Sequence, residues 1–206
     1  EANPLMSYEV SQGDPLLRVE LSNLLLDRGV QAMPDEIMVT SGAMQGLSLT
    51  ARALVQAGDT VLVEEPTYLG IIHLLRTLKV RILTVPMETD GPDMNVLEDI
   101  LCKEQVRFFY TVSGFQNPTG YLMSREKRRE LLSLAHRHNL LIVEDDIMGS
   151  LAYDAPALPA LKSYDVDDRV VYVNSISKTL MPGLRVGWVV APKEIHRLLI
   201  QQRLAD

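Results

Sequence analysis

The chain has 206 residues, of which 47% are hydrophobic and 23% charged, and its formal net charge is −7. This length suffices for one well-buried domain, and the composition is typical of globular proteins rather than disordered ones. No stripe of Lys and Arg runs through the sequence, so the chain itself is not expected to bind nucleic acid. A single cysteine, Cys102, excludes an intrachain disulfide framework, and we expect it to be a small buried side chain.

The sequence shows no signal-peptide pattern and no apolar run of membrane length, so we expect a soluble, cytoplasmic protein without a membrane partner. An abrupt start at Glu1 and a helical pattern over residues 193–206 suggest a piece of a longer protein. Neither repeats nor low-complexity linkers occur. We therefore predict one domain, residues 15–206, behind an N-terminal arm of residues 1–14.

Short apolar runs alternate with stretches of helical spacing along the rest of the chain. In chain order the pattern predicts strand 36–42, helix 43–58, strand 60–66, helix 67–79, strand 80–86, helix 92–104, strand 107–112, helix 124–139, strand 140–146, an irregular segment to about 168, strand 169–175 and a second apolar run at 186–192. Strands that are apolar on both faces and separated by helices favour a mainly parallel α/β sheet with helices on both sides.

Ligands of such sheets bind at the carboxyl ends of the strands. Polar residues gather at these ends while the strands themselves are nearly bare of them. The candidates are Ser41 to Met44, Glu65 to Tyr68, Phe115 to Pro118, Glu144 to Asp146, and Ser175 with Lys178.

Lys178 is the residue that suggests the chemistry. Alone, it is typical of a solvated loop lysine, but an amine at the edge of a buried sheet can also react with an aldehyde. Ser175, Ser177 and Arg185 offer groups suited to a phosphate, and the helix that opens after Gly42 offers free backbone N–H groups. A phosphate site beside a reactive amine favours pyridoxal 5′-phosphate as the cofactor.

Three further residues fit the same ligand. Asp145, directly after a buried run, can pair with a protonated pyridine nitrogen, whereas Glu144 and Asp146 are expected to cap a helix or lie in a solvated turn. Tyr68 can stack on the ring or be a core tyrosine. Asn117 can donate to the phenolic oxygen or be a turn residue before Pro118.

The ordered motifs resemble those of the class I and II aminotransferases of fold type I, especially the aminotransferase-like domains of MocR-type (GntR family) regulators. The resemblance covers the chain from Tyr8 to its end. The motifs are "Y-x4-G-x3-LR" from Tyr8, "PDEIMVTSGAMQGL", "EEPTY", "QNPTG", "VEDD" and "SISKTLMPGLRVGW".

The resemblance implies a role for each candidate residue. Lys178 would be the Schiff-base lysine and proton shuttle, and Asp145 the partner of the pyridine nitrogen. Asn117 would bind the phenolic oxygen, and Tyr68 would stack on the ring. The phosphate would be held by the backbone of Ala43 and Met44, by Ser175 and Arg185, and by Tyr8 of a second subunit.

The resemblance also implies the architecture. We expect a large domain with a seven-stranded, mostly parallel sheet in a three-layer αβα arrangement, and a homodimer with Tyr8 crossing to the neighbouring site. The small C-terminal domain, with its arginine for the substrate carboxylate, would lie beyond this chain. The Glu65-Pro66 or Asn117-Pro118 bond is expected to be cis.

Two positions depart from the family pattern. Ile147 and Met148 occupy the place of a tyrosine whose hydroxyl contacts the phenolic oxygen, and Ala43 replaces a common hydroxyl residue. The four histidines are scattered, so no zinc site is expected.

Three functions are therefore open. The first is an aminotransferase acting on an α-amino acid and a 2-oxo acid. The second is a sensor domain of a transcription regulator, whose DNA contacts would come from a domain outside this chain. The third, a degenerate relative without cofactor, fits less well because the expected ligand positions other than that tyrosine remain.

Overall fold

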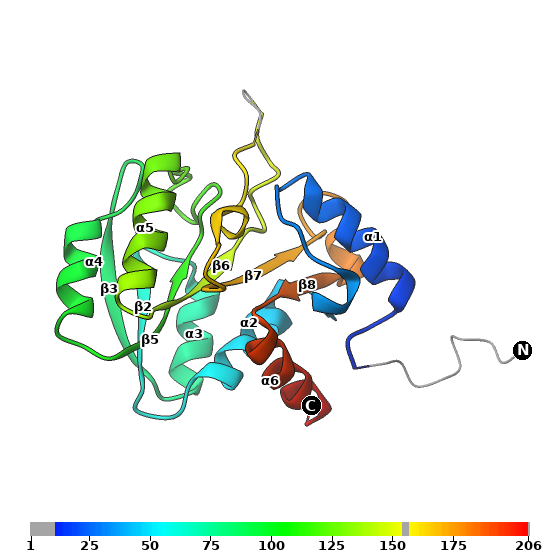
Figure 1. Ribbon diagram of the computed structural model, residues 1–206, viewed down its shortest axis with the longest axis horizontal. Coiled ribbons are helices and arrows are strands. Elements are labelled where there is room, and N and C mark those ends of the chain that lie inside the picture. Colours follow the sequence, from blue (N-terminus) through cyan, green and yellow to red (C-terminus); the bar gives the residue numbers. More distant parts are fainter. Residues whose placement is uncertain (1–10, 154–156, 206) are drawn as a thin grey trace, which may run out of the picture.

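The computed structural model describes residues 11–153 and 157–205, which form a mixed sheet packed between helices (Figure 1). Within these residues the sheet has eight strands in the order β1-β8-β7-β6-β5-β2-β3-β4. Their bounds are β1 Ile37–Thr40, β2 Thr60–Glu65, β3 Arg81–Glu88, β4 Gly91–Pro92, β5 Val106–Thr111, β6 Leu141–Asp145, β7 Val170–Ser175 and β8 Gly187–Val190. Strands β3, β2, β5, β6 and β7 pair in parallel, whereas β8 is antiparallel to both β7 and β1.

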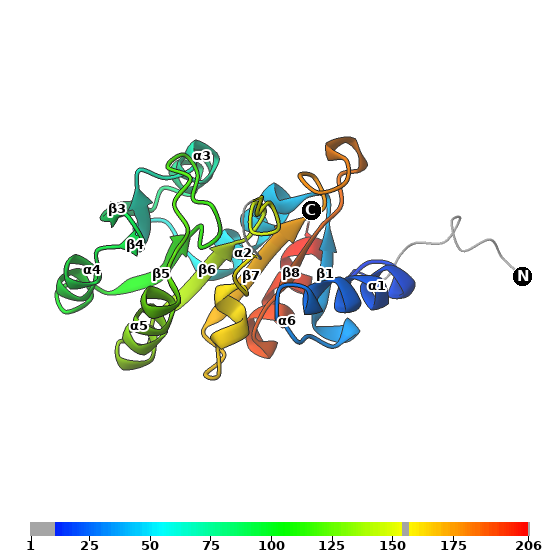
Figure 2. The same ribbon diagram turned by 90° about the horizontal axis from the view of Figure 1, so that it is seen from above.

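Helices cover both faces of the sheet, so the expected three-layer arrangement is confirmed (Figures 1 and 2). One face packs against α2, α3 and α6, and the other against α4 and α5, with α1 over β1, β8 and β7. The helices are α1 Pro15–Leu26, α2 Ala43–Leu54, α3 Leu69–Thr77, α4 Met94–Leu101, α5 Arg125–Arg137 and α6 Lys193–Leu204, with short 3₁₀ turns at Pro34–Glu36, Leu161–Tyr164 and Pro182–Leu184.

The central strands carry continuous apolar runs because successive side chains enter different cores. In β5, Phe108 and Tyr110 pack toward α2 and α3, whereas Phe109 packs toward α4 and α5. In β7, Val171 and Val173 face the α2 side and Tyr172 faces α1. This period-two alternation between two buried faces produces the continuous apolar runs of the sequence.

Three details differ from the expectations. The sheet has eight strands rather than seven because Gly91–Pro92 pairs with the end of β3, a ladder too short to leave a pattern in the sequence. Helix α1, for which the pattern predicted no element, begins at Pro15, and the Asp14 carboxylate accepts from the Leu17 N–H. Cys102 is exposed rather than buried because it lies just after the last turn of α4.

Both expected cis bonds, Glu65-Pro66 and Asn117-Pro118, are present. Among the described residues, no helix combines the length and apolar character needed to cross a membrane.

Candidate active site

The carboxyl ends of the parallel strands meet at one edge of the sheet, and a cavity of about 140 Å³ opens there. Four of the predicted site residues with side-chain roles line it together: Tyr68 follows β2, Asn117 follows β5, Asp145 ends β6 and Lys178 follows β7. The complete lining is Met44, Tyr68, Tyr110, Val112, Asn117, Asp145, Ile147, Met148 and Lys178.

Asp145 is the buried acid of this cavity, with 4% of its surface exposed. Its Oδ2 accepts a hydrogen bond of 2.8 Å from the Tyr110 hydroxyl, and its Oδ1 accepts one of 3.3 Å from the Ile147 N–H. Burial raises the pKa of Asp145 to about 6, and the Tyr110 and Ile147 hydrogen bonds oppose that rise because they stabilise the charged form. Near neutral pH the cavity therefore presents a carboxylate with both oxygens held in place.

Lys178 lines the cavity from the irregular segment between β7 and β8, and its side chain is largely exposed. Tyr68 caps the start of α3, and its ring lies directly against Gly70, where a Cβ atom would come within 2.3 Å of the ring. The cavity thus combines an amine, a carboxylate, an amide and an aromatic ring.

A second group of predicted residues lies around Gly187 at the same edge. Helix α2 begins after Gly42, which has φ 87° and provides no side-chain cap, so the first N–H groups of the helix have no capping side chain and could bind an anion. The Arg185 guanidinium lies against Gly42 and donates to the Ser41 carbonyl at 3.0 Å.

Gly187 makes this arrangement possible. A Cβ atom there would come within 2.8 Å of the Ala43 nitrogen, so only glycine lets β8 approach the start of α2 so closely. Ser175 pairs with Gly187 in the sheet, and its Oγ accepts from the Ser177 N–H at 3.3 Å. Ala43, Ser175 and Arg185 do not line the cavity itself; they form an adjoining cradle suited to an anion.

Tyr8, the remaining predicted residue, falls outside the described residues.

The residues present fit pyridoxal phosphate. The uncapped helix start with Arg185 suits its phosphate, and the buried Asp145 suits a protonated ring nitrogen. Ile147 and Met148 line the cavity with apolar groups, so neither supplies the hydroxyl that the family pattern places there. The Ala43 side chain offers no hydroxyl, which leaves the backbone, Ser175 and Arg185 as donors.

Two acids that were expected to cap a helix or lie in a solvated turn are buried. Glu144 is fully buried and accepts from Ser113 Oγ and from the N–H groups of Leu161 and Lys162, at the start of a 3₁₀ turn. Asp146 is fully buried in a bidentate ion pair with Arg28, at 2.8 and 3.0 Å. The expectation of a solvated turn was wrong because both acids pair with groups far away in the sequence.

Sequence reasoning also missed Tyr110 and Glu64, and it assigned no role to Gln116 within the candidate stretch Phe115 to Pro118. Tyr110 appeared as one apolar residue of a buried strand, and only its register beside β6 brings it to Asp145. Glu64, at 1% exposure, accepts from Thr111 Oγ1 and from Gln116 Nε2, and Gln116 also donates to the Pro66 carbonyl at 2.7 Å. These bonds join β2 to the segment that carries Asn117.

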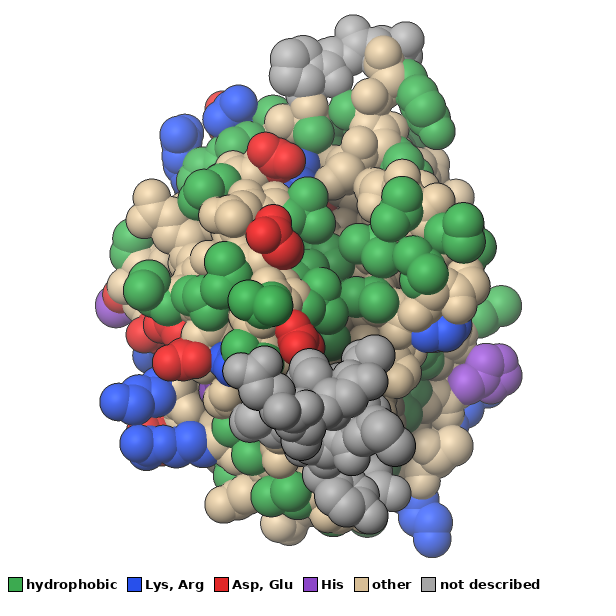
Figure 3. Space-filling model, turned by 90° about the vertical axis from the view of Figure 1, so that its right-hand side faces the viewer, with side chains coloured by type: hydrophobic (Ala, Val, Ile, Leu, Met, Phe, Trp, Pro, Cys, Tyr) green, Lys and Arg blue, Asp and Glu red, His purple; other side chains and the backbone are tan. Residues whose placement is uncertain are grey.

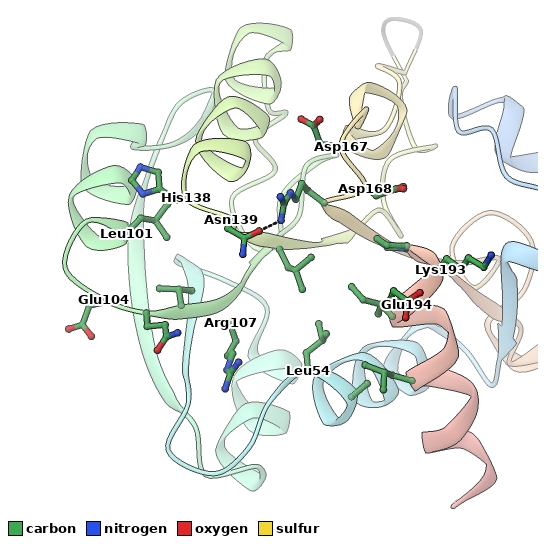
Figure 4. Close-up of a pocket in the computed structure, with 18 residues that line it drawn as sticks. Leu54, Leu101, Glu104, Arg107, His138, Asn139, Asp167, Asp168, Lys193 and Glu194 are labelled. Atoms are coloured by element: carbon green, nitrogen blue, oxygen red, sulfur yellow. Dashed lines mark hydrogen bonds between the residues drawn. The ribbon is translucent and has the colours of Figure 1, made fainter.

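A larger cavity, of about 920 Å³, lies at the opposite edge of the sheet (Figure 4). Its lining includes the amino ends of β5, β6 and β7 and the start of α6, where Lys193 and Glu194 are labelled. Size alone does not identify the site, because ligands of parallel sheets bind at the carboxyl ends and none of the candidate side chains reaches this cavity.

Comparisons with known proteins identify the family of the chain. The family model "Aminotransferase class I and II" matches residues 1–204. The chain is 36% identical over 202 residues to an uncharacterized HTH-type transcriptional regulator, YjiR, of Escherichia coli K12, covering 98% of this chain and 43% of that protein. It is 36% identical over 201 residues to 2-aminoadipate transaminase of Thermus thermophilus, covering 96% and 49%.

The crystal structure of LysN, an alpha-aminoadipate aminotransferase of Thermus thermophilus complexed with N-(5′-phosphopyridoxyl)-L-leucine, superposes with a TM-score of 0.90 at 35% identity. That match covers 97% of this chain and 51% of the other. The chain thus spans about half the length of the relatives that it matches.

Proposed function

The chain belongs to the class I and II aminotransferase family, and from that membership we propose that it is the pyridoxal phosphate-binding large domain of an aminotransferase. The substrates would be an α-amino acid and a 2-oxo acid. The observation that carries the proposal is the convergence of Lys178, Asp145 and Asn117 on one cavity beside the anion cradle at the start of α2.

Pyridoxal phosphate supplies an aldehyde that bonds to amines and a ring that accepts electron density from the substrate. Lys178 would provide the amine for that bond and would carry a proton to and from the substrate α-carbon. Asp145 would pair with the ring nitrogen, Asn117 would donate to the phenolic oxygen, and Tyr68 would stack on the ring. The backbone of Ala43 and Met44, together with Ser175 and Arg185, would hold the phosphate.

A homodimer belongs to the same proposal, with Tyr8 of one copy reaching the phosphate of the other. Its support is an exposed apolar surface on and near α1, on the side of the molecule that Figure 3 faces. Large exposed apolar patches mark association surfaces. The exposed side chains there are Leu16, Val19, Leu24, Leu26 and Met33.

The test is turnover by the purified full-length protein. Loaded with pyridoxal phosphate and given a panel of α-amino acids with pyruvate or 2-oxoglutarate, it is expected to convert the acceptor into its amino acid. A protein that binds the cofactor but transfers no amino group with any pair contradicts the enzyme proposal.

A second candidate is the effector domain of a MocR-type regulator, favoured by Ile147 and Met148 in place of the hydroxyl and by the similarity to an HTH-type regulator. In that case an amino acid would change the cofactor absorbance without product release, and DNA would be bound through a domain outside this chain. Titrating the loaded protein with amino acids while recording both the cofactor absorbance and the release of product separates the two candidates.

A further inference from the structure

We infer that Tyr110 is a positioning residue that holds Asp145 as an oriented carboxylate toward the ring nitrogen of the cofactor. This inference rests on the proposed function, since it concerns the same site. It assigns a task to a side chain that neither the motifs nor the family resemblance singled out.

The geometry supports a direct role. Tyr110 and Asp145 both line the cavity, with 0% and 4% of their surfaces exposed, and the hydroxyl donates to Oδ2 at 2.8 Å. Strands β5 and β6 are parallel neighbours in which Tyr110 pairs with Val143. Asp145 lies two residues further on the same face, so the phenol reaches it diagonally across the ladder.

Two donors fix the carboxylate plane. With Ile147 N–H on Oδ1 and Tyr110 on Oδ2, each oxygen keeps a free lone pair for a third donor in the cavity. Burial raises the pKa of Tyr110 well above its usual value, so the phenol remains protonated and acts only as a donor to the carboxylate.

Other charged groups face Asp145 and set its charge state. Burial and Asp146 raise the pKa of Asp145, whereas hydrogen bonds from Tyr110 and the Ile147 N–H lower it, and Asp145 in turn raises the pKa of Glu64 of β2. Lys178 borders the same cavity, as does Tyr68. Of these, the Tyr110 hydroxyl is the side-chain donor in contact with the carboxylate.

The competing explanation is that Tyr110 is a core tyrosine whose hydroxyl simply needs a hydrogen-bond partner. A second buried tyrosine of the chain serves as a matched control. Tyr172 of β7 is also fully buried, and its hydroxyl donates at 2.9 Å to the carboxylate of Asp146, which follows Asp145 in the sequence. That carboxylate faces α1 and Arg28 and does not line the cavity. Tyr172→Phe therefore removes the same kind of bond away from the site.

The experiment compares Tyr110→Phe and Tyr172→Phe in the full-length protein, by equilibrium dialysis of pyridoxal phosphate between pH 5 and 9. We expect Tyr110→Phe to weaken binding about tenfold at pH 5 and about twofold at pH 7, because the loss of a hydrogen bond to the charged form raises the pKa of Asp145. Binding should recover at higher pH, with the midpoint of the profile about one pH unit above that of the wild type. Tyr172→Phe should lose stability to denaturant but keep the wild-type profile.

A double-mutant cycle with Asp145→Asn identifies the route. In the Asp145→Asn background, Tyr110→Phe is expected to add no further loss, because there is no carboxylate left to hold. A full additional loss in that background, or profiles of the two Tyr→Phe variants that coincide, would overturn the inference.

A measurement without cofactor separates this inference from the proposed function. ¹³C NMR of the Asp145 carboxyl in the cofactor-free protein should show a higher pKa in Tyr110→Phe than in the wild type. A wild type that binds no pyridoxal phosphate refutes the proposed function and, with it, the role of Tyr110 at the ring nitrogen. A normal cofactor profile combined with an unchanged Asp145 pKa refutes only the role of Tyr110.

Discussion

Asp145 and Asp146 are neighbours in sequence, yet their carboxylates serve opposite faces of the sheet. Asp145 accepts from Tyr110 at the cavity, whereas Asp146 accepts from Arg28 and Tyr172 on the side of α1. The alternation of side chains along a strand separates them, so one acid is available to a ligand and the other joins α1 to the sheet. A positional difference of one residue thus distinguishes a site residue from a structural one.

The Arg28–Asp146 pair makes a prediction about stability. Replacing Arg28 with Met leaves Asp146 fully buried without its cation, which should lower the free energy of unfolding by about 3–5 kcal/mol. Denaturant unfolding of the cofactor-free protein measures the change.

The control is Arg81→Met, which removes a bidentate pair with Glu104 that is partly exposed to solvent. That variant should lose less than about 1 kcal/mol. Equal losses of unfolding free energy in the two variants would contradict the claim that burial makes the Arg28–Asp146 pair more important for stability.

The sequence alone was sufficient to locate Asp145, Asn117, Tyr68 and Lys178 at strand ends, and the structure brings all four to one cavity. It did not locate Tyr110, because a tyrosine within a buried strand carries no local sign of what its hydroxyl will meet. Nor did it locate the partners of Asp146, because Arg28 lies 118 residues away. Periodicity reports which face a side chain occupies, and the contacts depend on strand order and register.

At the scale of elements, the antiparallel strand β8 completes the anion cradle. It lies between β1 and β7 and runs opposite to both, so its first residue, Gly187, is level with their last residues, Thr40 and Ser175. Arg185, just before β8, therefore reaches the edge where the parallel strands end. The apolar run at residues 186–192 indicated a strand, but neither its direction nor its place in the order could be derived from it.

The close approach of β8 to α2 predicts the effect of one added methyl group. In Gly187→Ala the new Cβ would lie 2.6 Å from the Gly42 carbonyl carbon, so the strand and the helix start must separate. We expect a loss of about 1–3 kcal/mol in unfolding free energy and severalfold weaker binding of pyridoxal phosphate. Denaturant unfolding and equilibrium dialysis report the two effects.

Gly183→Ala provides the comparison, since no atom lies within 4 Å of a Cβ built there. That variant should match the wild type in both measurements. Wild-type cofactor affinity in Gly187→Ala would contradict the assignment of the cradle to the phosphate.

Helix α1 shows the limit of pattern analysis for an element. Its exposed face carries Leu16, Val19, Leu24 and Leu26, so apolar residues surround the helix and no amphipathic spacing stands out. A surface that is covered by a partner would produce this pattern. The absence of amphipathic spacing in α1 is therefore consistent with the proposed dimer.

For the whole molecule, the buried carboxyl groups make stability depend on pH. Burial raises the pKa of Glu64 and of Glu144 from 4.5 to about 7, and that of Asp145 from 3.8 to about 6. Each of these groups holds its proton more tightly in the folded state than in the unfolded state. Their contribution is therefore complete below about pH 4 and is lost as the pH rises through 6 to 7.

Other groups act in the opposite direction. The pKa of Asp165 is lowered because backbone N–H groups and Lys162 hold its carboxylate. The pKa values of the exposed Glu98 and Asp59 are lowered as well. These three groups reduce stability as the pH falls toward 4 and below. Buried His196, whose pKa is also lowered, reduces stability as the pH falls through 6.5. Between pH 5 and 7.5, three carboxyl groups with raised pKa values act against this one histidine. We therefore expect the cofactor-free protein to be more stable at pH 5 than at pH 7.5.

Urea unfolding at several pH values from 5 to 7.5 measures how the free energy of unfolding changes with pH. The variant Glu64→Gln tests the cause of that change. For a group with the pKa of Glu64, the difference in unfolding free energy between pH 5 and 7.5 corresponds to about 2 kcal/mol. The variant should flatten the slope accordingly. Stability that rises from pH 5 to 7.5, or a slope unchanged in Glu64→Gln, would contradict the burial of this acid as the main cause of the pH dependence.

The central claim is that Lys178 is the amine to which the cofactor bonds. The most direct measurement is borohydride reduction of the full-length protein loaded with pyridoxal phosphate, followed by proteolysis and mass spectrometry. The account predicts one stable phosphopyridoxyl group, located on Lys178 and missing from Lys178→Ala. A group found on another lysine, or none in a protein that binds the cofactor, would contradict it.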